Sequence, residues 1–202
     1  MGYSFNSALA DIIDNSITAN ADSVWVMAIP SDECRVAIID DGDGLVRDEL
    51  MRAMKLGSSD PRQQRGLNDL GRFGLGLKTA SFSQCRRLTV ASRCNGVTAA
   101  FTWDLDLVVE QNKWTVIERD DVKEIPFSEE LGKSGTLVLW EKLDRLDGSQ
   151  EGGKANLSRV ISEAQDYLSL VFHRYLSGEK GIKRISIHHQ ALLDPKATWR
   201  RA

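Results

Sequence analysis

The stretch GRFGLGLK, residues 71–78, places three glycines directly before a helical segment. Gly71, Gly74 and Gly76 leave backbone N–H groups accessible, and the N-terminus of the following helix adds the positive end of its dipole. That combination suits a phosphate group. The spacing G-x-x-G-x-G is the reverse of the dinucleotide fingerprint, and it also differs from the Walker A pattern. Taken alone, the glycine cluster is weak evidence for a nucleotide site.

A second cluster, DDGDGL, breaks the chain sharply after an apolar run. Asp40 ends a strand whose VAII segment should be buried, so its carboxylate is either exposed at the strand end or held there for a ligand. Gly42 and Gly44 allow unusual backbone angles or a close approach of the backbone. A plain turn is the simpler interpretation. A calcium loop is excluded, because the D-x-D-G order and the glutamate at loop position twelve are missing.

A third group lies in ALADIIDNSITANADSV, residues 8–24, where apolar residues recur at helical spacing. Asp11 and Asn15 are four residues apart and therefore project from one face of the predicted helix. Ile12, Ile13 and Ile17 cover a different arc. A solvated polar stripe is the simpler interpretation, since charged residues are usually exposed.

Composition sets the class of protein. The chain has 202 residues, 42% of them hydrophobic and 27% charged, with a net charge of -3. These values predict a packed globular protein without a basic footprint for nucleic acid. Three cysteines without C-x-x-C spacing favour reduced thiols. No segment has the pattern of a membrane span or a signal peptide, so we expect a cytoplasmic protein.

The predicted elements are helices and strands joined by short connections. They follow the order helix, two strands, helix, helix, several strands, a long helix over 157–178 and a last strand, with a long polar loop at 58–72. Short strand-to-strand connections predict an α+β sandwich, with a mixed, mostly antiparallel sheet and helices on one face. The apolar residues of the long helix are expected to be core: Tyr167, Leu168, Leu170, Val171, Phe172 and Tyr175.

Four motifs in this order are specific: DIIDN, DDGDG, GRFGLGLK and a Gly-Thr pair, Gly135 and Thr136, before a late strand. Together they resemble the GHKL superfamily, the Bergerat-fold ATPases that include gyrase B subunits, ninety-kilodalton heat-shock chaperones, sensor histidine kinases and MutL. The second glycine box is most similar to that of the MORC-like and MutL-like branch. The resemblance covers about residues 5–140.

The resemblance assigns roles to the matching positions. The family's helix asparagine coordinates the Mg²⁺ that bridges the triphosphate, and Asn15 matches it. The position four residues earlier, usually a glutamate that polarises the attacking water, is Asp11, whose side chain is one methylene shorter. Asp40 matches the aspartate that accepts a hydrogen bond from the adenine amine and shares a water with Thr136. The further nucleotide contacts implied are Gly42, Gly44, Met54, Gly74, Gly76, Leu77 and Lys78.

The same resemblance implies an ATP/ADP cycle. Residues 58–72 resemble an ATP lid whose closure drives a conformational or dimerisation switch during slow hydrolysis. We expect an ATP-binding domain over 1–145. Residues 146–202 either extend it or begin a following domain, the chain being a fragment that lacks a C-terminal domain. The implied partners include a homodimer, and neither a membrane nor direct nucleic-acid binding is indicated.

Two alternatives remain open. A nucleotide-gated binding module without turnover is favoured by Asp11 in place of glutamate and by the end of the chain at Ala202. A histidine-kinase catalytic domain is disfavoured, because there is no helix pair with a phospho-accepting histidine. His173 lies on an apolar helix, and His188 and His189 are too isolated for a metal site.

Overall fold

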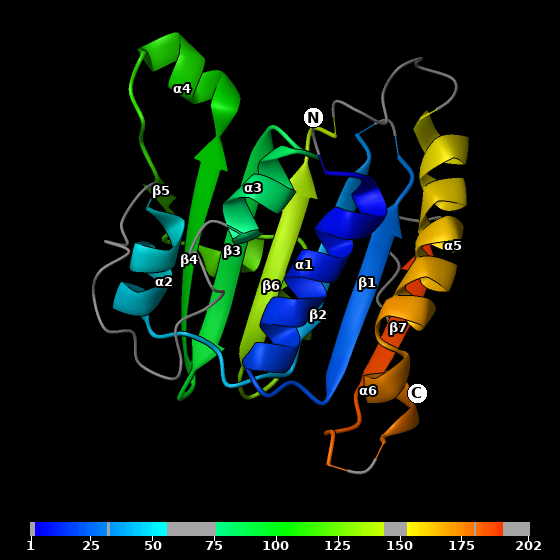
Figure 1. Cartoon of the computed structure of the whole chain (residues 1–202). Helices are drawn as coiled ribbons and strands as arrows, with labels where there is room; N and C mark the ends of the chain where they lie inside the picture. Colours follow the sequence, from blue (N-terminus) through cyan, green and yellow to red (C-terminus); the bar gives the residue numbers. More distant parts are fainter. Residues whose placement is uncertain (1–2, 32, 56–75, 144–152, 180, 192–202) are drawn as a thin grey trace, which may run out of the picture.

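One sheet organises the molecule. The computed structural model describes residues 3–31, 33–55, 76–143, 153–179 and 181–191. Within these ranges seven strands form a sheet in the order β5-β4-β3-β6-β2-β1-β7 (Figure 1). β7 is parallel to β1, and the other neighbouring pairs are antiparallel. The strands are β1 (Ser23–Ile29), β2 (Arg35–Asp40), β3 (Arg87–Cys94), β4 (Val97–Asp104), β5 (Ile117–Glu118), β6 (Gly135–Glu141) and β7 (Ser186–Ala191).

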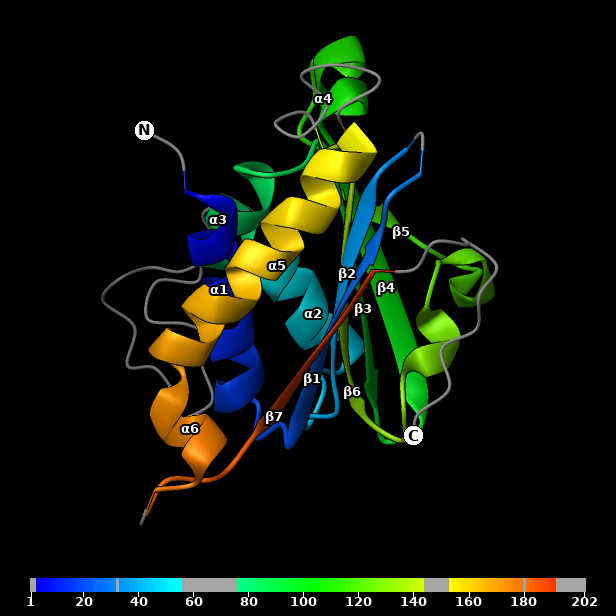
Figure 2. The same cartoon turned by 90° about the vertical axis from the view of Figure 1, so that its right-hand side faces the viewer.

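The helices lie mainly on one side of this sheet. Figures 1 and 2 show α1, α2, α3 and α5 on one face, whereas α4 stands beyond the end of β4. The predicted α+β fold, with a mostly antiparallel sheet and helices on one face, is confirmed. The helices are α1 (Phe5–Thr18), α2 (Arg47–Met54), α3 (Gly76–Phe82), α4 (Leu105–Gln111), α5 (Gly153–Val171) and α6 (His173–Ser177).

Apolar side chains are buried on both faces of the sheet. Along β1, Val24 and Val26 belong to the core beneath the helices, whereas Trp25 and Met27 belong to a second core on the other face. Two short 3-10 turns, η1 (Val122–Glu124) and η2 (Ser128–Glu130), belong to the segment that closes this second core. Burial on both faces explains why the central strands are continuous apolar runs rather than alternating ones.

Three local predictions were wrong. Of the several strands expected before the long helix, the one over 113–120 is reduced to β5, and the unpredicted α4 begins where Asp104 accepts a hydrogen bond from the Asp106 backbone N–H. The long C-terminal helix is interrupted at Phe172, whose side chain turns into the core. As a result, the apolar stripe on this helix is divided between core and surface. Leu168 and Phe172 are buried, but the predicted core residues Tyr167, Leu170 and Val171 are exposed.

Residues beyond the predicted boundary at 145 pack on the same layers. β7 pairs with β1 in a register that begins at Ser23 and Ser186, and α5 contacts α1. The division of the chain at this boundary stays a prediction. Within the described residues, no helix combines the length and apolarity required to cross a membrane.

Gly44 is fixed by space as well as by backbone angle. Its φ is +70°, and a Cβ at this position would lie 2.0 Å from the Arg93 carbonyl oxygen. Gly96, in the turn between β3 and β4, has a similar φ of +76° but open space around it. The two glycines therefore share the conformational constraint and differ in the steric one.

We expect Gly44→Ala to lower the free energy of unfolding by about 3 kcal/mol or more, because backbone must move in addition to the left-handed strain. Gly96→Ala is the matched control and should cost about 1–2 kcal/mol, the left-handed strain alone. Urea unfolding of both variants measures the difference. Equal losses of unfolding free energy in the two variants would show that the backbone after β2 can move at little cost, which would contradict the steric constraint at Gly44.

Candidate nucleotide site

α1 carries the first predicted site residues across the sheet. The helix begins at Ser4, whose side chain accepts a hydrogen bond from the Ser7 N–H. Its apolar arc faces the core, and Asp11 and Asn15 lie half-buried outside that arc. The helix therefore presents a carboxylate and an amide on a face that the sheet does not occupy, as predicted from their spacing.

Asp40 is the most enclosed of the predicted site residues that can ionise as acids. It is the last residue of β2, pairs in register with Thr136 of β6, and is only 7% exposed. One carboxylate oxygen, Oδ1, accepts hydrogen bonds from the backbone N–H groups of Gly42 (3.0 Å) and Thr136 (3.1 Å). The other, Oδ2, accepts one from the Ser16 hydroxyl (2.9 Å). Three segments of the chain therefore converge on a single side chain.

Burial raises the pKa of Asp40 to about 6. The hydrogen bonds from Gly42, Ser16 and Thr136 oppose this shift, because they favour the charged form, whereas the neighbouring Asp41 adds to it. At neutral pH the carboxylate is ionised and only accepts hydrogen bonds. A carboxylate has about four lone-pair positions, and the three donors leave one of them, on Oδ2, for a ligand.

Glycines allow the three segments to meet. A Cβ on Gly42 would lie 2.6 Å from the Ala19 carbonyl oxygen, at the C-terminal end of α1. Gly135 has φ +137°, and a Cβ there would lie 2.1 Å from the Asp40 carbonyl oxygen. These contacts bring the end of α1, the turn after β2 and the start of β6 together around the Asp40 side chain.

The other two aspartates of the DDGDG turn bind backbone and side chains nearby. Asp41 Oδ1 accepts hydrogen bonds from the N–H groups of Asp22 and Ser23, both at 2.8 Å. Asp43 accepts a hydrogen bond from the Asn20 side chain (2.7 Å). Both therefore hold the turn against the connection between α1 and β1, whereas Asp40 is the aspartate of this motif that joins α1 to β6.

Two serines of the site were missed by sequence reasoning. Ser16 bonds Asp40, and its position on the buried arc of α1, four residues after Ile12, was the available signal. Ser92 of β3 is fully buried and accepts a hydrogen bond from the Leu45 N–H (2.8 Å). Its hydroxyl also lies 2.9 Å from the Thr136 hydroxyl. Nothing in the local sequence distinguished Ser92 from any other strand residue.

The remaining predicted contacts are distributed unevenly. Gly76 and Leu77 lie in the first turn of α3, and Gly74 lies outside the described residues. The Lys78 side chain is only 2% exposed, its ammonium donates to the Lys55 carbonyl, and burial lowers its pKa. Met54 is fully buried, and its carbonyl accepts from Trp103. The structure thus directs both side chains inward, and their nucleotide contacts stay predictions.

Asp11 has a pKa above its ordinary value, mainly because of burial. A hydrogen bond from the Tyr3 side chain opposes the shift, and the nearby Asp14 charge adds to it. A carboxylate with a raised pKa is a stronger base than a fully solvated one. Asp11 is therefore suited to accept a proton, provided that a water molecule can reach it.

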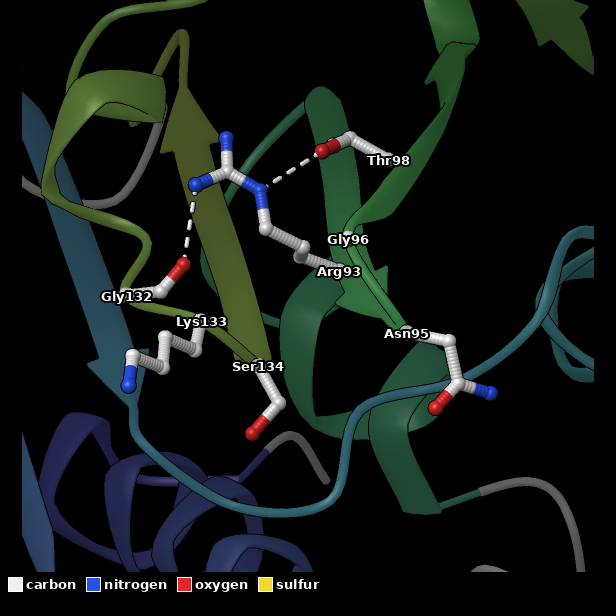
Figure 3. Close-up of a pocket in the computed structure, with 7 residues that line it drawn as sticks. All are labelled: Arg93, Asn95, Gly96, Thr98, Gly132, Lys133 and Ser134. Atoms are coloured by element: carbon white, nitrogen blue, oxygen red, sulfur yellow. Dashed lines mark hydrogen bonds between the residues drawn. The ribbon is translucent and has the colours of Figure 1, made fainter.

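A cavity of about 670 Å³ lies elsewhere, beside the turn between β3 and β4. Arg93 is a cation that lines this cavity. Its guanidinium donates hydrogen bonds to the Thr98 hydroxyl and to the carbonyl oxygens of Leu131 and Gly132. Figure 3 shows Lys133 and Asn95 pointing away from each other rather than toward a common centre. None of the predicted nucleotide residues lines this cavity, so it does not contribute to the site around Asp40.

Comparison with known proteins decides the family. The sequence model described as "Histidine kinase-, DNA gyrase B-, and HSP90-like ATPase" matches residues 3–136, which include α1, the DDGDG turn, α3 and Thr136. The chain belongs to this family. The resemblance to the GHKL superfamily is confirmed, and so is the expectation of an ATPase domain that binds ATP.

Two curated relatives of this GHKL domain are MORC proteins. It is 30% identical over 95 residues to "ATPase morc-1" of Caenorhabditis elegans and 32% identical over 78 residues to "MORC family CW-type zinc finger protein 3" of Mus musculus. The matches cover 46% and 37% of this chain but only 11% and 8% of those proteins. The chain therefore corresponds to a small part of each relative.

A solved structure supports the fold of the GHKL domain. It is described as the "Crystal Structure of N terminal domain of a DNA repair protein" and superposes with a TM-score of 0.52 at 19% sequence identity. The superposition covers 92% of this chain and 49% of that one. At this level of identity the similarity shows a shared fold.

The raised pKa of Asp40 makes stability depend on pH. The folded protein holds the Asp40 proton at pH values where the unfolded chain, with a pKa near 3.8, has lost it. Between about pH 4 and 6 the free energy of unfolding should therefore fall as the pH rises, by up to about 3 kcal/mol from this group.

Asp40→Asn removes this titration while keeping the shape of the side chain. Urea unfolding from pH 4 to 7 is expected to show that the variant gains stability relative to the parent as the pH rises. Asp120→Asn, at an exposed aspartate, is the matched control and should track the parent. A constant difference between Asp40→Asn and the parent would contradict the raised pKa.

Proposed function

We propose that this domain binds Mg·ATP beside α1 and hydrolyses it slowly, and that the nucleotide cycle drives closure of residues 58–72 and a conformational or dimerisation switch. The observation that carries the proposal is the Asp40 carboxylate, held by three internal donors with one acceptor position remaining. Membership of the ATPase family supports ATP as the ligand. The geometry around Asp40 supports recognition of the adenine ring.

Asp40 accounts for selection of adenine. Its remaining lone pair can accept a hydrogen bond from an exocyclic amine, but it repels the carbonyl oxygen that guanine carries at the equivalent position. The Thr136 hydroxyl, next to Ser92, supplies the second polar group through a shared water. Gly42 and Gly44 are the proposed backbone contacts of the turn, whose position is fixed because both glycines pack directly on the Ala19 and Arg93 carbonyl groups.

Asn15 fits the role of a magnesium ligand. Magnesium is commonly bound by one or two protein oxygens together with phosphate oxygens and waters. The Asn15 amide is half-buried, and within the described part of the chain no hydrogen bond occupies it. When bound, the metal neutralises charge on the phosphates. Gly74, Gly76 and Leu77 would offer backbone donors to them, and Lys78 would join once its ammonium leaves the Lys55 carbonyl.

Asp11 is the proposed general base. It shares the outward face of α1 with Asn15, and its raised pKa favours proton acceptance. Its side chain is one methylene shorter than glutamate, so the attacking water must come closer to α1 for proton transfer. We therefore infer slow turnover. The same feature supports the second candidate, a nucleotide-gated binding module that does not turn over.

The wider setting is also part of the proposal. The three cysteines are free thiols in the structure, which is consistent with the reducing cytoplasm. The chain matches only small parts of its curated relatives, which supports a following domain in the full-length protein. We also propose that the full-length protein forms a homodimer. We propose that Met54 forms one wall of the purine pocket. Because its side chain is fully buried, it would have to shift when the nucleotide binds.

Calorimetry with ATP and Mg²⁺ tests the adenine site. In Asp40→Asn the side-chain oxygen keeps the two backbone donors, and the amide nitrogen can donate to Ser16, so the fold should survive. The remaining position becomes a donor, so we expect ATP affinity to fall by about 100-fold while inosine triphosphate, which carries a carbonyl, loses much less. Asp120→Asn should bind ATP like the parent.

The rate of phosphate release from ATP tests the role of Asp11 as general base. Asp11→Asn should bind ATP within about twofold of the parent and lose turnover by about 100-fold or more. Binding without turnover in the parent would favour the gated module. Failure of the parent to bind any adenine nucleotide would refute the site and leave only the fold.

A further inference from the structure

Asp40, Thr136 and Ser92 lie side by side on three neighbouring strands. Asp40 of β2 pairs in register with Thr136 of β6, and Thr136 pairs in register with Ser92 of β3. The side chains of directly paired residues stand on the same face of a sheet, so the three form one row. Ser92 is fully buried, whereas Thr136 is half-buried. The row therefore places a partly accessible threonine between the proposed adenine-binding carboxylate and an enclosed serine.

The Ser92 hydroxyl has three partners within hydrogen-bond distance. It accepts from the Leu45 backbone N–H at 2.8 Å and donates to the Gly135 carbonyl oxygen at 3.1 Å. The Thr136 hydroxyl oxygen lies 2.9 Å away, and by distance alone either hydroxyl can supply the hydrogen of that contact. A serine hydroxyl offers one hydrogen and two lone pairs, so these three contacts use its full capacity.

Counting hydrogens fixes the direction of the contact between the two hydroxyls. The Leu45 N–H occupies one lone pair of Ser92, and the Gly135 carbonyl, which only accepts, takes its hydrogen. The second lone pair of Ser92 then accepts from Thr136. In the reverse arrangement the oxygens of Ser92 and Gly135 would face each other with no hydrogen between them. Only donation by Thr136 gives each of the three contacts a hydrogen, as buried polar groups require.

Donation to Ser92 leaves the Thr136 hydroxyl with lone pairs only. Within the part of the chain that the structure describes, no other hydrogen bond reaches this oxygen. The Thr136 backbone N–H does not serve a ligand either, because it donates to Asp40. The Asp40 carboxylate itself only accepts when it is ionised. The two side chains proposed to face the base thus offer acceptors and no hydrogen, which suits an amine and disfavours a carbonyl oxygen.

We propose that Ser92 is a positioning residue that sets the specificity of the adenine site: it takes up the hydrogen of the Thr136 hydroxyl, so that Thr136 only accepts hydrogen bonds from the ligand side. A bridging water passes this polarity on, because a hydrogen that it gives to Thr136 is not available to the base. The inference rests on the proposed binding of ATP beside Asp40. It adds a residue outside all four sequence motifs to the discrimination between adenine and purines with a carbonyl at the same position.

Ser92 also has a structural role, which the test must separate from this one. Its bond to the Leu45 N–H holds the end of the turn after β2, and without the hydroxyl that donor loses its partner. A structural effect changes the affinity for every nucleotide alike. A change in the polarity of Thr136 instead changes the ratio of the affinities for ATP and inosine triphosphate.

The test measures both affinities by calorimetry with Mg²⁺ at about pH 8, where Asp40 is ionised. In Ser92→Ala the Thr136 hydrogen is released and becomes available to a carbonyl, directly or through water. We expect the preference of the parent for ATP over inosine triphosphate to fall by about fivefold or more, the equivalent of one hydrogen bond. Ser92→Cys fills the same space with a weaker donor and acceptor, so it should lower the preference in the same direction.

Two further variants identify how Ser92 acts. Thr136→Val removes the hydroxyl that Ser92 is proposed to orient, so adding Ser92→Ala to it should change the ATP preference by less than about twofold. Thr89→Val is the matched control, because it removes a buried hydroxyl from the same strand, one that lies 2.9 Å from the Thr102 hydroxyl. It should lower the free energy of unfolding and leave the ATP preference unchanged.

The outcomes separate this inference from the proposed function. A lower ATP preference in Ser92→Ala, with no further change in the Thr136→Val background, supports the inference. Weaker binding of both nucleotides at an unchanged ratio means a structural effect and overturns it. An equal change of the ratio in both backgrounds overturns it too, since Ser92 would then act without Thr136. In these two cases loss of ATP affinity in Asp40→Asn still supports the proposed function. A parent chain that binds no adenine nucleotide refutes the site, and Ser92 loses this role with it.

Discussion

The hydrogen bonds to the Asp40 carboxylate are the constraint on which the site depends. Ser16 comes from α1, Gly42 from the turn after β2, and Thr136 from β6, so the side chain joins a helix to two strands that are distant in sequence. A buried carboxylate is costly unless donors compensate it. The donors stabilise the charge and fix its direction together, so the proposed specificity for adenine and the integrity of the fold rest on the same atoms.

Carboxylate chemistry explains why three aspartates can share one turn. Asp41 and Asp43 accept from groups in the connection between α1 and β1, so their charges are matched with N–H donors at short range. The remaining repulsion still raises the pKa of Asp40. Asp40 tolerates this because its own donors act in the opposite direction. The motif is therefore one electrostatic unit in which Asp41 and Asp43 build the turn and Asp40 joins it to α1 and β6.

The order of the motifs predicted the family from sequence, and it drew attention to the segments that meet around Asp40. Asp11, Asn15 and Asp40 could be placed because their roles depend on helical spacing and on the end of a buried strand, both of which are local patterns. Ser92 could not, since its importance arises from Leu45 and Thr136, each more than forty residues away. Likewise, α4 depends on Asp104, a buried carboxylate that caps the helix while Arg87 and Lys142 neutralise it. No local window of sequence contains that arrangement.

The surroundings of Asp40 and the outward face of α1 differ in how many hydrogen bonds fix their side chains. This difference affects how the proposed site would work. The proposed adenine end centres on the buried Asp40 and Ser92, each of which makes two or more hydrogen bonds. The proposed hydrolytic end consists of two half-buried side chains, Asp11 and Asn15, on one face of α1. Under the proposed function, rigid recognition beside adjustable chemistry would let the nucleotide bind first and the catalytic arrangement be completed afterwards. In a domain of this kind, the proposed rate of hydrolysis would then be set by whatever orders the outward face of α1, without any change in the affinity for adenine.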